Sequence, residues 1–116
     1  FSGMRLLHRL DGRVAIWPMD PLPDGGSAVV EIYTRIYLRN SGMSGKKLRT
    51  RAELDRALSG LGSKPVRLNF EPNDHQTDAL VTAAGMRALL TDPRAFSPPG
   101  LTSELSQTEG WTFGIV

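Results

Sequence analysis

The sequence has no cysteine, which excludes disulfide bonds and thiolate metal sites. Because disulfides belong to oxidising compartments, this absence favours a cytoplasmic location. The chain also lacks any run of about 18 apolar residues, the length that a membrane-spanning helix requires. Its first residues carry Arg5, His8 and Arg9 among apolar positions, which is not the pattern of a signal peptide. We therefore expect a cytoplasmic protein without a membrane span.

Length and composition are those of an ordinary globular domain. The 116 residues are 40% hydrophobic and 22% charged, which suits one domain over residues 1–116 with a core large enough to fold. The chain opens on Phe1 rather than on Met, and a proteolytic piece is one of several explanations for this start.

Positive charge is concentrated in the middle of the chain, although the whole carries a formal net charge of only +2. Residues 35–64 hold eight basic side chains against two acidic ones. The basic residues are Arg35, Arg39, Lys46, Lys47, Arg49, Arg51, Arg56 and Lys64. Such an excess favours binding to phosphate groups. A solvated loop and helix surface is the alternative interpretation.

Start and stop signals predict three helices. Leucines at helical spacing predict the first helix over residues 2–10, before the turn at Asp11-Gly12. The capping-box sequence Thr50-Arg51-Ala52-Glu53 opens the second, over 51–61. Asn73, followed three residues later by Gln76, opens the third, which continues to residue 90.

Apolar and β-branched runs predict strands over residues 13–17, 27–38 and 109–116. Residues 66–70 are either a further short strand or an extended lead-in to the third helix. In the last predicted strand the aromatic side chains share one face, which favours core packing over stacking on bases.

Three carboxylates are candidates for a metal site. Asp74 and Asp78 are four residues apart, so they lie on one face of the predicted helix. Glu31 stands inside the predicted strand over 27–38, where a charge either faces solvent or is held at a site. Carboxylate oxygens are the ligands that Mg²⁺ and Mn²⁺ prefer. The alternative interpretation is an acidic first turn on an ordinary amphipathic helix.

Several short motifs together resemble an uncharacterised family of predicted nucleases with an RNase H-like fold. The motifs are Val-Val-Glu-Ile-Tyr-Thr-Arg at 29–35, Asn-Asp-His-Gln-Thr-Asp-Ala-Leu-Val at 73–81 and Glu-Gly-Trp-Thr-Phe-Gly at 109–114. Ser-Gly-Met at 2–4 and Ala-Ile-Trp-Pro-Met-Asp at 15–20 fit the same family in the same order. The resemblance implies an α/β fold, in which a mixed sheet has flanking helices. It also implies the hydrolysis of phosphodiesters with Mg²⁺ or Mn²⁺.

The resemblance also implies roles for particular residues. Glu31, Asp74 and Asp78 would be the catalytic metal ligands, and His75 would orient a water or shuttle a proton. A capping or surface role is the alternative for His75. Phosphate contacts would come from four residues of the basic segment: Lys46, Lys47, Arg49 and Arg51.

Two departures from the family pattern affect these expectations. Thr34 stands where the family usually has Pro, and the chain matches only the C-terminal half or so of the family's length. The family's first-strand Asp would precede residue 1, so we expect an incomplete sheet, low nuclease activity and a homodimer that covers the exposed strand edge. A non-catalytic nucleic-acid-binding or protein-interaction module is the alternative function. A third possibility is a stable core fragment whose activity depends on residues outside this chain.

Overall fold

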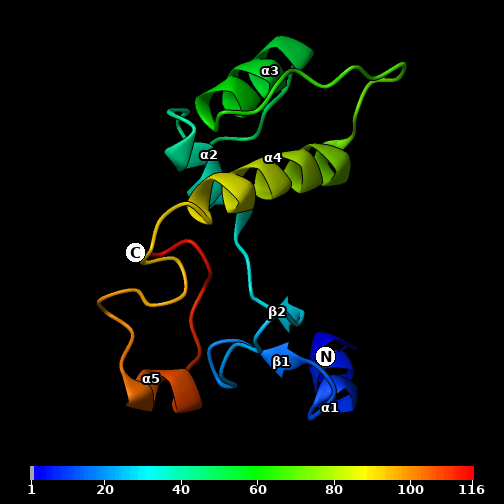
Figure 1. The fold of residues 1–116 in the computed structure, drawn as a ribbon. Coiled ribbons are helices and arrows are strands. Elements are labelled where there is room, and N and C mark those ends of the chain that lie inside the picture. Colours follow the sequence, from blue (N-terminus) through cyan, green and yellow to red (C-terminus); the bar gives the residue numbers. More distant parts are fainter. Residues whose placement is uncertain (1) are drawn as a thin grey trace.

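Helices, not strands, make up most of the regular structure (Figure 1). The computed structural model describes residues 2–116. Along these residues the elements are α1 (Ser2–Leu10), β1 (Ala15–Ile16), β2 (Ala28–Val29), α2 (Thr34–Asn40), α3 (Arg51–Gly60), α4 (Asp74–Leu89) and α5 (Ser103–Thr108). The three helices predicted over 2–10, 51–61 and 73–90 are therefore confirmed.

Helix α4 begins at the capping box that its sequence predicts. The Asn73 side chain accepts a hydrogen bond from the Gln76 backbone N–H at 2.9 Å, and the Gln76 side chain accepts one from the Asn73 N–H at 2.9 Å. Two of the backbone donors that a helix start leaves free are thus satisfied. Helix α3 has a related start, in which the Thr50 hydroxyl accepts from the Glu53 N–H at 3.1 Å.

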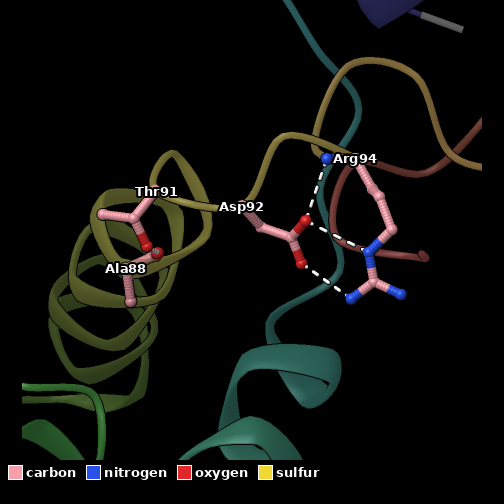
Figure 2. A network of polar contacts seen from close by, with 4 residues as sticks. All are labelled: Ala88, Thr91, Asp92 and Arg94. Atoms are coloured by element: carbon pink, nitrogen blue, oxygen red, sulfur yellow. Dashed lines mark hydrogen bonds and ion pairs between the residues drawn. The ribbon is translucent and has the colours of Figure 1, made fainter.

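A compact network of polar contacts follows the end of α4 (Figure 2). The Thr91 hydroxyl donates to the Ala88 carbonyl at 2.8 Å, which satisfies one of the last carbonyls of the helix. The Asp92 carboxylate accepts from the backbone N–H of Arg94 at 2.8 Å and from its guanidinium at 2.8 and 3.1 Å. These bonds hold the pKa of Asp92 below its usual value. They fix the direction in which the chain leaves the helix.

Helix α4 packs against both α2 and α3. Its contact with α2 is close because Gly85 has no side chain: a Cβ there would lie only 2.6 Å from the Tyr37 Cβ and Cγ atoms. Tyr37 is fully buried, and the Thr34 and Thr82 hydroxyls meet 2.9 Å apart across the same pair of helices. Leu54 and Leu58 of α3 fill the core on the other side.

An aromatic cluster joins these helices to the strand-bearing part of the molecule. Trp17 lies edge-on to Phe96 and to Phe113, with ring centroids 5.8 and 5.7 Å apart, and Phe96 and Phe113 are 4.9 Å apart. The Tyr37 hydroxyl donates a buried hydrogen bond of 2.7 Å to the Phe113 carbonyl. The C-terminal segment is thereby attached directly to α2.

The predicted RNase H-like α/β fold with a mixed sheet is wrong. Among residues 2–116 the sheet consists of β1 and β2 alone, which pair in parallel with Ala15 opposite Ala28 and Ile16 opposite Val29. The predicted strand over 27–38 forms a strand only at Ala28–Val29, with an isolated bridge at Glu31, and its second half is helix α2. The burial of Tyr37 against α4 outweighs the β-propensity of this run, which depends strongly on context.

The strand predicted over 13–17 is confirmed at β1, whereas the strand predicted over 109–116 is wrong. The segment 109–116 contributes only one isolated parallel bridge, between Thr112 and Glu31, because the chain turns at Gly110 and Gly114, both with positive φ. Residues 66–70 form the extended lead-in to α4 and no strand. Helix α5, which begins at the N-cap Thr102, was not predicted. Within the described residues, no helix is both long and apolar enough to cross a membrane.

Candidate nucleic-acid interface

The loop between α2 and α3 is held against two arginine side chains of α2. Gly45 is buried and has a φ of +77°, a conformation that favours glycine. A Cβ at this position would lie 3.2 Å from the Cγ atoms of both Arg35 and Arg39. The backbone of the loop therefore rests on the aliphatic parts of these arginines, whose charged ends remain available to solvent.

A basic pocket of about 580 Å³ lies beside this loop. Its lining is Arg35, Met43, Ser44, Lys46, Lys47, Leu48, Arg49 and Glu53. Four cations thus face one carboxylate, and apolar side chains form part of the wall. The composition is that of a site for an anion with apolar parts.

The single carboxylate of the pocket is engaged in starting α3. Glu53 accepts from the Arg49 backbone N–H and from the Thr50 hydroxyl, both at 3.4 Å. Among residues 2–116, no carboxylate lies within ion-pair distance of the charged groups of Arg35, Lys46 or Arg49. Within the described residues, three of the four cations of the basic pocket therefore form no ion pair.

Lys47 is the exception, because it forms an ion pair and hydrogen bond with Asp74. The hydrogen bond and the charge of Lys47 lower the pKa of Asp74, and the same bond raises the pKa of Lys47. Both side chains are largely exposed, so the pair contributes little to stability. Its structural consequence is that the basic loop is attached to the first turn of α4.

Arg51 lies outside the lining of the basic pocket. Its guanidinium donates to the Phe70 carbonyl at 2.6 Å and lies 3.9 Å from the Glu71 carboxylate. Of the four predicted phosphate-binding residues, Lys46, Lys47 and Arg49 line the pocket and Arg51 holds the segment before α4. Arg35 was missed, because the predicted strand over 27–38 gave no reason to place it beside Gly45.

The three predicted metal ligands are not brought together. Glu31 is exposed and accepts from the Thr112 hydroxyl at 3.2 Å, in a separate pocket of about 240 Å³ that Glu109 and Trp111 also line. Asp74 is paired with Lys47, and Asp78 is exposed on α4. Within residues 2–116, no three His, Asp or Glu side chains are grouped so that they could hold a metal ion.

His75 is also exposed, in the first turn of α4. The geometry therefore gives no support to Mg²⁺ or Mn²⁺ at these residues or to a proton-transfer role for His75, and both stay predictions.

Comparisons of the chain with protein families, with curated proteins and with solved structures find no match. The basic pocket is therefore the feature of the molecule from which a function can be inferred.

Proposed function

We propose that this chain binds nucleic acid, without catalysis, through the basic pocket between α2 and α3. The observation that carries the proposal is the placement of Arg35, Lys46 and Arg49 around one pocket with no carboxylate paired to them among the described residues. Together with Lys47, they give this face a strongly positive local potential.

Phosphates are the counter-charge that fits this arrangement best. Neighbouring cations repel one another, and an anion that bridges them relieves the repulsion. A nucleic-acid backbone presents phosphates in a row and releases its condensed counterions when lysine and arginine replace them. Contacts of this kind position a backbone but do not read its sequence, so we expect weak sequence preference.

The separation of the carboxylates favours the non-catalytic alternative over a nuclease. Hydrolysis assisted by two metal ions needs carboxylates that converge on the reacting phosphate, whereas Glu31 lies in a different pocket from the lysines. Nuclease activity, the homodimer and a cytoplasmic location stay predictions made from the sequence.

The test is the affinity of the full chain for a fluorescein-labelled 20-nucleotide oligonucleotide, measured by fluorescence anisotropy at several salt concentrations. For Lys46→Ala/Arg49→Ala we expect affinity to fall about tenfold or more at low salt. The slope of log K against log salt should fall by about two, because two phosphate contacts are lost. The matched control is Arg5→Ala/Arg9→Ala on α1, which removes the same charge far from the basic pocket in sequence.

The two double variants separate a specific surface from general attraction to a basic protein. The proposal requires the control to bind like the unaltered chain, apart from a small loss. Equal losses in both double variants would show that net charge alone is responsible. No binding by the unaltered chain at 50 mM salt would refute the proposal directly.

A further inference from the structure

An exposed aromatic ring lies next to the basic segment. Phe70 is 48% exposed, and it stands in the extended segment that joins α3 to α4. Its ring is not part of the hydrophobic core that holds the other described phenylalanines, Phe96 and Phe113. Core packing therefore does not explain an aromatic side chain at this position.

Two contacts fix the segment around Phe70 beside the basic residues. At one end the Arg51 guanidinium donates to the Phe70 carbonyl at 2.6 Å. At the other end Lys47 pairs with Asp74, at the start of α4. Figure 1 shows the segment running back along α3 before it turns into α4. The backbone at Phe70 thus lies beside Arg51, and the segment ends beside Lys47.

Cations beside an exposed ring are the combination that single-stranded nucleic acids use. Lysine and arginine follow the phosphates, and the aromatic ring stacks on an unpaired base. In a duplex both faces of each base are covered by its neighbours, so a phenyl ring on a protein surface reaches no base face without unstacking. The basic pocket alone would bind either form; Phe70 adds an interaction that only the single strand offers.

We infer that the nucleic acid bound by this chain is single-stranded and that Phe70 stacks on one of its bases. This inference rests on the proposed function, because it assigns the form of nucleic acid that the basic pocket takes. Phosphates would lie along Lys46 and Arg49, and the base next to Arg51 would turn toward Phe70. Stacking accepts any base, which agrees with weak sequence preference.

The test compares three ligands of similar charge: a 15-nucleotide single strand, a short duplex and inorganic polyphosphate. Phe70→Leu keeps an apolar side chain but removes the ring, and Phe70→Tyr keeps the ring. We expect Phe70→Leu to weaken single-strand binding about fivefold or more. Phe70→Tyr should stay within about twofold of the unaltered chain. Duplex and polyphosphate affinities should not change in either variant.

Leu90→Ala serves as the control, because it shortens another exposed apolar side chain. A second readout comes from Phe70→Trp, whose added fluorescence should be quenched by the single strand and not by polyphosphate. If no variant binds any ligand, the proposed function fails. If single strand and duplex bind equally and Phe70→Leu changes neither, the proposed function stands and this inference is overturned.

Discussion

The α2–α4 region (residues 34–89) and the other described residues differ in how their elements are packed (Figure 1). In the α2–α4 region, Leu54, Leu58 and Val81 are at most 2% exposed, and the helices lie in close contact. The remainder has two-residue strands, long loops and exposed large side chains: Met4, Leu6, Met19, Leu22, Ile115 and Val116.

This difference bears on where binding can be built. A site holds its geometry better on elements whose packing is fixed than on loops. The basic pocket takes Arg35 from α2 and Glu53 from α3, and Gly45 rests on α2. Arg35 thus stands on a packed helix, and the loop that carries Lys46, Lys47 and Arg49 is bounded by α2 and α3. The aromatic cluster around Phe113 links the remainder to it without contributing to the pocket.

A leucine-to-alanine substitution in each region should give the largest difference in the free energy of unfolding. Leu58→Ala removes a side chain that is 2% exposed, so we expect a loss of about 2–5 kcal/mol in the free energy of unfolding. Leu6→Ala on α1 removes one that is 57% exposed and should cost less than about 0.5 kcal/mol. Urea denaturation followed by circular dichroism measures both. Equal losses would show that the two regions are packed alike.

The burial of Tyr37, whose hydroxyl donates to the Phe113 carbonyl of the other region, should make the free energy of unfolding depend on pH in alkali. Burial raises the pKa of Tyr37 from 10.0 to about 12, so the folded chain keeps the phenol proton that the unfolded chain loses. The stabilisation that comes from the protonated Tyr37 phenol is fully present below pH 10 and is lost as pH rises toward 12. It amounts to about 2–3 kcal/mol in the free energy of unfolding. Urea denaturation at pH 9 and pH 11 should show about half of this loss, roughly 1.3 kcal/mol. Tyr37→Phe should remove this part of the pH dependence, and an unchanged dependence in that variant would contradict the assignment.

Gly85→Ala tests the close approach of α2 and α4. In a free helix this change stabilises by about 1 kcal/mol, because glycine is a poor helix former. Here the new Cβ would meet the Tyr37 side chain, so we expect a net destabilisation of about 1–3 kcal/mol instead. The sign of the shift in thermal midpoint decides the matter: an increase would mean that the helices are not in contact there.

Helix caps give the smallest expected contrast. Asn73→Ala removes the capping box of α4 and should cost about 1 kcal/mol. Thr102→Ala removes a single cap from α5, a helix of six residues with no buried side chain. We expect a smaller effect on global unfolding from Thr102→Ala. Chemical denaturation measures the loss in the free energy of unfolding for both variants. A larger loss in Thr102→Ala than in Asn73→Ala would contradict the expected order.

How much the sequence predicts depends on whether the deciding interactions are local. The start of α4 was predictable because Asn73 and Gln76 cap within one turn. Helix α2 was not, because its sequence alternates like a strand and its conformation is decided by Tyr37 meeting Gly85, far along the chain. A non-local contact of this kind leaves no periodic signal.

The site divides in the same way. The basic segment was visible from the sequence as an excess of lysines and arginines, and three of the four residues predicted to bind phosphate line the pocket. The place of Arg35 in the pocket could not be predicted, because it depends on the contact of Gly45 with α2. The separation of Glu31 from Asp74 likewise appears only in the three-dimensional structure. Acidic residues on a predicted strand and a predicted helix do not by themselves show whether their carboxylates meet.

An NMR titration of the ¹⁵N-labelled chain with a single-stranded oligonucleotide tests directly whether the basic pocket and Phe70 bind nucleic acid. We expect shifts of the backbone amide signals at Arg35, in residues 43–49 and around Phe70, with the signals of α1 and α5 unchanged. Raising the salt concentration should reverse these shifts. Shifts centred on α1 or on the pocket that contains Glu31, with the signals of 43–49 unmoved, would contradict the account.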